Sequence, residues 1–157
     1  MGMSMTWRFA EIENETRVML EGDISEESDF RGLVSSASSP LVLDLRSVVQ
    51  INSCGVREWI NFVRQLEKQG CNLTFANCPP PIVRQLNMIS NFKGPGVIRS
   101  VLAPYYCDDC NRDEMKPISI GVESMNFEIV ETIPCPECGE DMEFDDMPDS
   151  YLEFMNH

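Results

Sequence analysis

Hydrophobic and polar positions along the first hundred residues follow two periods, one typical of strands and one typical of helices. Apolar and polar residues alternate over 7–12 and resume over 17–20, with turn residues at 13–16 between them, which predicts a hairpin. Residues 41–45 form a short apolar run, which is typical of a strand covered on both faces and therefore central in a sheet. A further strand is predicted over 71–76.

Helical periodicity separates these strands. Asp23 or Ser25 can cap a short helix that runs through Val34. From 53 to 69 the apolar residues recur at helical spacing, and Gly70 is well placed to end this second helix. A third helix follows a triple-proline break and carries its apolar residues at Ile82, Val83, Leu86 and Ile89. The succession predicts an α/β fold, with a mixed β-sheet packed with helices through right-handed crossovers.

Glycine and proline residues over 93–96 punctuate the chain, and a strand is predicted to leave this turn over 97–102. A domain boundary is expected near residue 100. We therefore predict one α/β domain over 1–100 and a small module over 101–157, which is consistent with a chain of 157 residues that is 43% hydrophobic and 24% charged.

The charge of the chain is concentrated in its last third. The net charge is −14, and the first hundred residues hold 10 basic and 11 acidic side chains against 2 and 15 in the remainder. Such a surface repels phosphate backbones and anionic lipids, so neither nucleic acid nor a membrane is expected as a partner. The chain also shows neither an export signal nor an apolar run of about 18 residues, which predicts a cytoplasmic protein.

Two C-x-x-C pairs stand out in the acidic module. Cys107 with Cys110, and Cys135 with Cys138, form two knuckles in which a two-residue spacer lets both thiolates of a pair approach one ion. Gly139 follows the second pair and allows the backbone to turn tightly. Segments 117–120 and 127–130 alternate as half-buried strands between the knuckles. The pattern predicts a zinc ribbon with one structural Zn²⁺ held by four cysteines.

A closed four-cysteine site leaves no coordination position for a substrate, and the only histidine is His157. We therefore expect no enzymatic activity. Iron is the competing metal because thiolate tetrahedra accept either ion, and a coloured protein would indicate it.

The end of the module carries a cluster of apolar residues. Asp146 can cap a short C-terminal helix whose early positions include Pro148. The apolar residues that follow are expected to serve as core for the small module rather than as a docking face, and they are Tyr151, Leu152, Phe154 and Met155.

Three motifs of the first domain are also familiar as a set. They are Leu43-Asp44-Leu45, then Ile51-Asn52-Ser53-Cys54-Gly55 opening a helix, then 73–77 followed by Pro80 and 83–86. In order and spacing the segment from about residue 5 to 95 resembles the STAS domain, the family of the bacterial anti-sigma factor antagonists and of the cytoplasmic domains of sulfate transporters. The likeness implies a mixed sheet with helices, as the periodicity predicts independently.

The resemblance also implies a partner-binding face at the loop and first helical turn formed by Asn52, Ser53, Cys54 and Gly55. In family antagonists the residue directly before this glycine is a phosphorylated serine or threonine. Here Cys54 holds that position and Asn52 replaces the usual acidic residue, so Ser53 is the remaining candidate for phosphorylation. A helix start can also receive an anion or a partner's carboxylate.

Two interpretations of this turn stay open. Ser53 can simply cap the helix while Cys54 is a small buried apolar residue. Alternatively, Cys54 has a lowered pKa and senses oxidants or electrophiles.

The sequence thus predicts a non-enzymatic bacterial signal-transduction protein of the anti-sigma factor antagonist type. Its expected partner is a regulatory protein, namely an anti-sigma factor, a sensor kinase or another STAS protein. A homodimer of this chain is also possible as an assembly. The alternatives are a thiol or iron redox sensor or carrier, and a nucleic-acid-binding ribbon, which the acidic module opposes.

Overall fold

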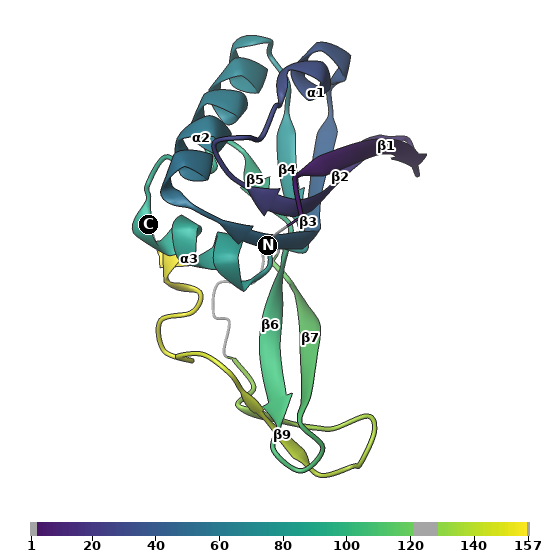
Figure 1. The fold of residues 1–157 in the computed structure, drawn as a ribbon, viewed down its shortest axis with the longest axis vertical. Helices are drawn as coiled ribbons and strands as arrows, with labels where there is room; N and C mark the ends of the chain where they lie inside the picture. Colours follow the sequence, from purple (N-terminus) through teal and green to yellow (C-terminus); the bar gives the residue numbers. More distant parts are fainter. Residues whose placement is uncertain (1–2, 121–128, 157) are drawn as a thin grey trace.

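The computed structural model describes residues 3–120 and 129–156 and contains two β-sheets (Figure 1). The first sheet has five strands in the order β1-β2-β3-β4-β5, with β1 antiparallel to β2 and the other neighbours parallel. Its strands are β1 (Thr6–Ile12), β2 (Glu15–Ile24), β3 (Leu41–Ile51), β4 (Leu73–Ala76) and β5 (Val97–Ile98). Its helices are α1 (Arg31–Ser36), α2 (Ser53–Lys68) and α3 (Pro80–Met88). The predicted α/β class is confirmed.

The core of this unit lies between the central strand and α2. Leu41, Leu43 and Leu45 of β3 are fully buried, as the apolar run predicted for a central strand. The α2 helix, predicted over 53–69, buries Trp59 and Leu66 on the face opposite its charged residues. Parallel strands covered by helices require such continuous apolar segments, which is why the pattern was informative.

The first predicted helix is shorter than expected. The α1 helix begins at Arg31, whereas Asp23 still belongs to β2. Ser25 starts a turn in which its own backbone N–H donates to Ser28 Oγ (2.9 Å), so this serine does not cap α1. The expected cap at Asp23 or Ser25 was therefore wrong, because a local turn competes for the same polar residues.

The strand predicted over 97–102 is divided between the two sheets. It breaks at Arg99, whose N–H donates to Phe75 O in the first sheet (2.8 Å) and whose C=O accepts from Ile120 N (2.8 Å). The second sheet is antiparallel and has the order β7-β6-β9-β8. Its strands are β6 (Ser100–Cys107), β7 (Arg112–Ser119), β8 (Thr132–Pro134) and β9 (Asp141–Phe144).

The two strands predicted between the knuckles have different outcomes. Residues 117–119 lie in β7, as expected. In the segment 127–130, the first two residues lie outside the described part of the chain, and Ile129 and Val130 are not in a strand. The strand that pairs with β9 is instead β8, which begins at Thr132.

The C-terminal segment returns to the first unit. Met147 N donates to Asp146 Oδ1 (2.7 Å), successive turns follow, and a 3-10 helix, η1 (Glu153–Asn156), ends the described chain. Tyr151, Leu152 and Phe154 are buried, but they join the core of the first sheet rather than that of the small module. Their expected role as core is confirmed, and the expected location was wrong.

Asn87 of α3 fixes this docking. Its side-chain amide donates to Tyr151 O (2.9 Å) and its oxygen accepts from Phe154 N (2.7 Å). Figure 1 shows the terminal segment running from β9 back to α3. Within residues 3–120 and 129–156, no helix is both long enough and apolar enough to cross a membrane.

Candidate functional site

The two cysteine knuckles lie at adjacent turns of the second sheet. Cys107 is the last residue of β6, and Cys110 lies in the turn that leads to β7. Cys135 follows β8, and Cys138 lies in the turn before β9. The pairing of β6 with β9 brings the two turns together, so the sheet topology places cysteines that are 25 and 31 residues apart in sequence next to one another.

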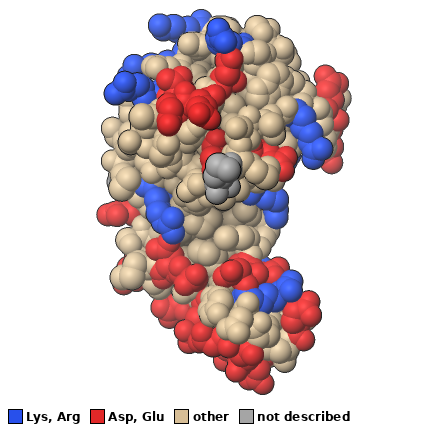
Figure 2. Space-filling model, in the orientation of Figure 1, with Lys and Arg blue, Asp and Glu red and all other residues tan. Residues whose placement is uncertain are grey.

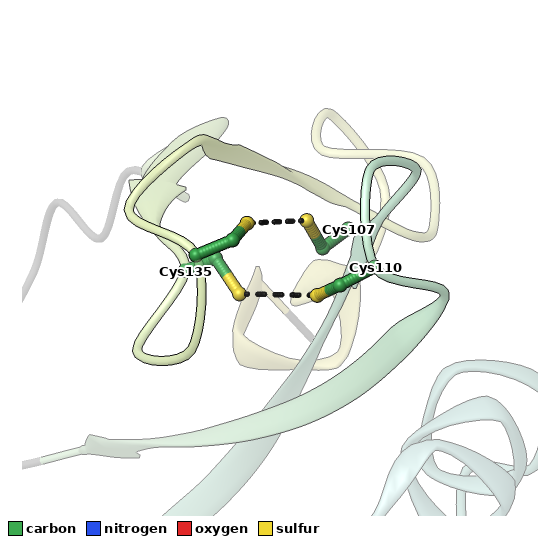
Figure 3. Close-up of side chains that lie close together, drawn as sticks. Cys107, Cys110 and Cys135 are labelled. Carbon is green, nitrogen blue, oxygen red and sulfur yellow. Dashed lines mark hydrogen bonds between the residues drawn. The ribbon is translucent and has the colours of Figure 1, made fainter.

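All four sulfur atoms lie within 4.8 Å of one another. Cys107 Sγ is 3.5 Å from Cys138 Sγ, and Cys110 Sγ is 3.6 Å from Cys135 Sγ (Figure 3). Four thiolates about 2.3 Å from one tetrahedral ion would have sulfur–sulfur separations of about 3.8 Å. The observed cluster therefore fits a single metal ion with four sulfur ligands. The predicted ligand residues are the ones that the structure brings together.

The backbone of the second knuckle is shaped for thiolate ligands. Gly139 has φ of +78°, a conformation that favours glycine, and its N–H donates to Cys135 O (2.9 Å). Backbone N–H groups of Cys138 and Glu137 lower the pKa of the Cys135 thiol to about 7. Desolvation and hydrogen bonds with the neighbouring thiols raise the pKa of Cys110 to about 12. The Cys135 thiol is thus easier to ionise than an ordinary thiol, and the Cys110 thiol is harder to ionise. A bound cation would stabilise both thiolates.

The module around these cysteines has little apolar core of its own. Its second hydrophobic cluster contains five buried residues, two of which are predicted metal ligands: Ala103, Tyr105, Cys107, Cys135 and Met142. A core of this size supplies little folding free energy, so a structural metal fits the construction of the module. Cys107 and Cys135 are buried, whereas Cys110 and Cys138 are exposed.

Acidic side chains cover the face of this module seen in Figure 2, where red atoms predominate over its surface. Arg112 contacts Glu114 (3.2 Å) and Glu137 (3.4 Å), so part of the little basic charge is neutralised locally. This surface disfavours a polyanionic ligand.

The predicted partner face lies at the start of α2, on the first unit. Asn52 is the N-cap, and its side-chain oxygen accepts from Gly55 N (2.7 Å). Asn52, Ser53 and Cys54 are exposed, and Gly55 is buried. The interpretation in which Ser53 caps the helix and Cys54 is buried was therefore wrong on both points. Asn52 is a favoured capping residue, and this signal was present in the sequence.

The backbone at Gly55 lies so close to the end of β2 that this position requires glycine. A Cβ atom at this position would lie 2.2 Å from Ile24 O, so only glycine allows α2 to begin here. The glycine fixes the helix start against the end of β2, and this contact holds the exposed first turn in one orientation.

The surroundings of the helix start are acidic. A cavity of about 320 Å³ adjoins Asn52, and its lining includes Asp23, Glu26 and Glu27. A backbone hydrogen bond within Glu26 and a hydrogen bond from the Asn52 side chain lower the pKa of the Glu26 carboxyl. These carboxylates oppose an anion at the helix start, and Asn52 already occupies one of its free N–H groups. The expected attraction of a carboxylate is accordingly weak here.

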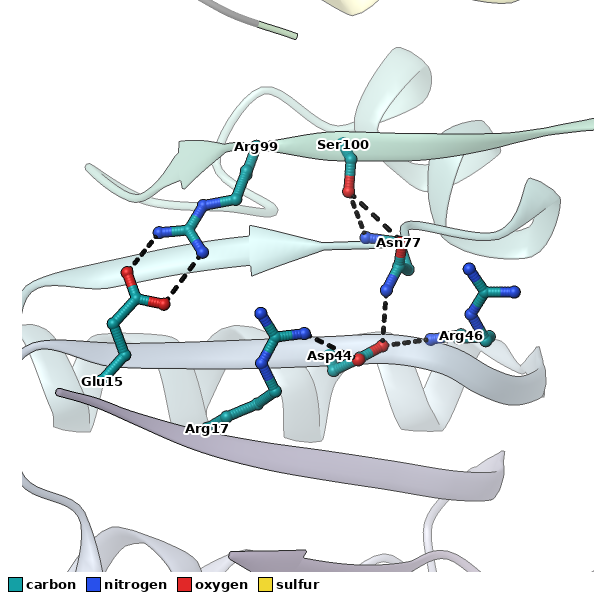
Figure 4. A network of polar contacts seen from close by, with 7 residues as sticks. All are labelled: Glu15, Arg17, Asp44, Arg46, Asn77, Arg99 and Ser100. Carbon is teal, nitrogen blue, oxygen red and sulfur yellow. Dashed lines mark hydrogen bonds and ion pairs between the residues drawn. The ribbon is translucent and has the colours of Figure 1, made fainter. Parts of the chain in front are cut away.

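A polar network on the first sheet was not predicted from the sequence (Figure 4). Asp44 of β3 accepts from Arg17 Nη1 (3.1 Å) and from Asn77 Nδ2 (3.2 Å). Asn77 N in turn donates to Ser100 Oγ (2.8 Å), the first residue of β6. The network joins β2, β3 and the residue that follows β4 to the second sheet. The signal in the sequence was a charged residue, Asp44, inside the apolar run 41–45.

A second ion pair closes the same junction. Arg99 and Glu15 form two hydrogen bonds of 2.7 and 3.0 Å. The hydrogen bonds from the Arg99 side chain are the main cause that lowers the pKa of Glu15. The point where the chain passes from one sheet to the other is therefore held by side chains as well as by the backbone.

Comparison with known families identifies the first unit. The STAS domain family matches residues 8–101, which is more than half of the chain, so this chain belongs to the STAS domain family. The matched segment contains all five strands of the first sheet except the first residues of β1, and it ends at the second residue of β6. No curated protein matches the chain.

Proposed function

We propose that this chain is a non-enzymatic cytoplasmic regulatory protein of the anti-sigma factor antagonist type, which binds a protein partner through the start of α2. The observation that carries the proposal is the exposed turn Asn52–Cys54, fixed over the buried Gly55 within a STAS domain. STAS domains are typically non-catalytic, and their function depends on the surface that they present. The proposed partner is an anti-sigma factor, a sensor kinase or another STAS protein, including a second copy of this chain.

The negative charge around this turn indicates which side chains of a partner could bind there. Asp23, Glu26 and Glu27 line the adjoining cavity, so a lysine or arginine of the partner is favoured there. A nucleic-acid partner is disfavoured by the same carboxylates and by the acidic module. Ser53 is exposed and can be reached by a kinase, and a phosphate beside Glu26 would oppose the existing charge.

Affinity capture from the source cell tests this proposal. The wild-type chain should recover a regulatory protein, and a double variant Ser53→Asp with Cys54→Arg should lose it. The matched control is Arg64→Ala, since Arg64 is exposed further along α2 and should not affect recovery. Recovery of the same partner by wild type and double variant alike would contradict the proposed face.

We also propose that the four-cysteine cluster binds one structural Zn²⁺. Cys107, Cys110, Cys135 and Cys138 would hold the ion, and four ligands would complete its coordination, so the ion would stabilise the module rather than activate water. Elemental analysis of the isolated chain should find one zinc per chain and a colourless solution. Visible absorption with bound iron would instead support the redox alternative.

The thiol form of the redox alternative rests on Cys54. Its exposure at the helix start makes it accessible to an electrophile. Alkylation rates measured across pH distinguish the two functions: a reactive Cys54 that titrates below an ordinary thiol supports a sensor, and an ordinary rate supports the adaptor.

A further inference from the structure

A groove lies at the junction of the two sheets, away from the start of α2. It has a volume of about 380 Å³ and receives side chains from both units. From the first unit it is lined by Arg46, Val49, Pro81 and Arg84, and from the second by Pro104 and Met115.

One wall of the groove follows the edge of β3. The pairing of β3 with β4 covers only Leu41–Asp44, so among the described residues this strand pairs beyond Asp44 with β2 alone. Val48 and Val49 both line the groove although successive side chains of a strand point to opposite faces. The groove therefore runs along the strand edge, where no other strand in residues 3–120 or 129–156 pairs with the side away from β2. Prolines 79–81 at the start of α3 also line the groove, and they have no N–H to offer this edge.

The floor of the groove is apolar and accessible. Val49 is 63% exposed and Met115 is 41% exposed, which are high values for large apolar side chains. The half-buried Pro81 and the buried Pro104 complete the apolar part of the lining. An aliphatic side chain of a partner would be desolvated by contact with these residues.

Two guanidinium groups frame this apolar surface on a chain whose net charge is −14. Arg46 is exposed and forms no ion pair with any residue in the described ranges, and its guanidinium points away from Asp44 in Figure 4. Arg84 lies 3.6 Å from Asp146, without a hydrogen bond, and its side chain is 60% exposed. Asp145 also lines the groove and Asp146 is the acidic neighbour of Arg84, so Arg46 is the arginine of this lining that has no ion pair among the described residues.

We propose that this groove binds an extended peptide segment of a partner protein, in which an aliphatic side chain is flanked by carboxylates. The aliphatic side chain would contact Val49 and Met115, and the carboxylates would pair with Arg46 and Arg84. An extended backbone can form hydrogen bonds with β3 beyond Asp44, where the pairing with β4 has ended, as in other cases of strand addition. The guanidinium of Arg46, unpaired among the described residues, and the exposed one of Arg84 favour carboxylates of a partner by charge complementarity. This site is separate from the start of α2 and does not depend on the function proposed for it.

The groove further requires both units to be folded. Pro104, Met115 and Asp145 come from the second sheet, whose strands hold the cysteine cluster. Loss of order in this module would remove one wall of the groove. Peptide binding should consequently depend on the integrity of the four-cysteine cluster.

Selection from a displayed library of random octapeptides against the full chain tests the proposal. The expected consensus is an aliphatic residue with aspartate or glutamate on both sides. The capped consensus peptide is then titrated by fluorescence anisotropy, and the double variant Arg46→Ala with Arg84→Ala should weaken its binding by at least about tenfold, because charged hydrogen bonds are lost. Arg64→Ala is the matched control and should leave the dissociation constant unchanged.

The other outcomes are equally decisive. A consensus without acidic residues, the absence of any enrichment, or equal binding by the double variant overturns the proposal. Self-association of the wild-type chain that disappears in the double variant also overturns it and assigns the groove to a second copy. Unchanged peptide binding by the Ser53/Cys54 double variant, together with loss of binding in Cys107→Ser, supports the groove as described.

Discussion

The hydroxyl of Tyr151 supplies a hydrogen bond that the backbone cannot. Cys78 forms an isolated parallel β-bridge with Val101 of β6. Its N–H donates to Ser100 O (3.1 Å), and its C=O accepts from Leu102 N (2.8 Å). The next donor along such a ladder would be the N–H of residue 80, which is proline. Tyr151 Oη instead donates to Leu102 O (2.6 Å). Burial raises the pKa of Tyr151 above its usual range, so this donor stays protonated at neutral pH.

We expect Tyr151→Phe to isolate the contribution of this bond, because the ring is retained and only the oxygen is lost. Leu102 is 1% exposed and Tyr151 is 3% exposed, so water cannot replace the donor without disturbing the packing. An unsatisfied buried carbonyl costs about 1–3 kcal/mol of unfolding free energy. For a chain of this size, each kcal/mol corresponds to a decrease in melting temperature of roughly 2–4 °C.

Urea unfolding monitored by tryptophan fluorescence measures this effect, because Trp59 is fully buried in the core of the first unit. Tyr106→Phe is the matched control, since its hydroxyl makes an exposed hydrogen bond to Asn111 (2.8 Å) and its loss should cost less than about 0.5 kcal/mol. If Tyr151→Phe unfolds at the same urea concentration as Tyr106→Phe, the terminal segment does not belong to the cooperative core of the STAS domain, and the reasoning fails.

Three further perturbations test individual contacts of the fold and the candidate sites. Gly55→Ala should lower the free energy of unfolding by about 1–3 kcal/mol in thermal denaturation, because its Cβ would lie 2.2 Å from Ile24 O. Cys107→Ser should reduce the metal content found by elemental analysis from one ion per chain to almost none, with loss of a contribution on the order of 10 kcal/mol to the folding of the module. Hydrogen bonds from Arg31 lower the pKa of Asp29 from 3.8 to about 2. Since the folded-state pKa is the lower one, the pair stabilises the fold above about pH 4 and is lost towards pH 2, and Arg31→Ala should return the NMR titration midpoint to near 3.8.

Each of these three predictions has a control substitution that should have no measurable effect. Ser53→Ala changes an exposed residue beside the glycine and should stay within about 0.5 kcal/mol of wild type. Cys71→Ser changes a cysteine outside the cluster and should leave the metal content intact. Arg64→Ala should not move the titration of Asp29. A glycine variant as stable as Ser53→Ala, a metal-loaded Cys107→Ser, or an Asp29 midpoint insensitive to Arg31 would each contradict the corresponding argument.

Periodicity predicted the elements whose structure depends on local sequence. The α2 helix was predicted within one residue because its apolar stripe continues without interruption to Gly70. The helix expected to follow a cap at Asp23 or Ser25 begins only at Arg31, because Ser25 and Ser28 form hydrogen bonds with each other in a turn. The sequence could not show that the strand predicted over 97–102 is split between two sheets, since the break at Arg99 depends on hydrogen bonds to two distant segments.

The candidate sites likewise contain features that the sequence predicts and features that it does not. The C-x-x-C spacing was sufficient to predict the four-cysteine cluster, because each knuckle is local and only one pairing of strands was needed to join them. The docking of Tyr151 was not predictable, because it depends on Asn87 and on the missing N–H of Pro80, neither of which has a periodic signal. The groove at Arg46 and Arg84 was equally hidden, since it exists only where two sheets meet.

The return of the terminal segment to α3 has a consequence for protein synthesis. Phe154 leaves the ribosome 67 residues after Asn87, the residue that holds it in place. Until then the nascent STAS domain has an uncovered apolar surface and unpaired amide groups on α3, although its five-stranded sheet can already pair. Completion of the fold therefore waits for translation of the entire metal-binding module, and translation arrest within that module would leave a chain that chaperones and proteases can recognise.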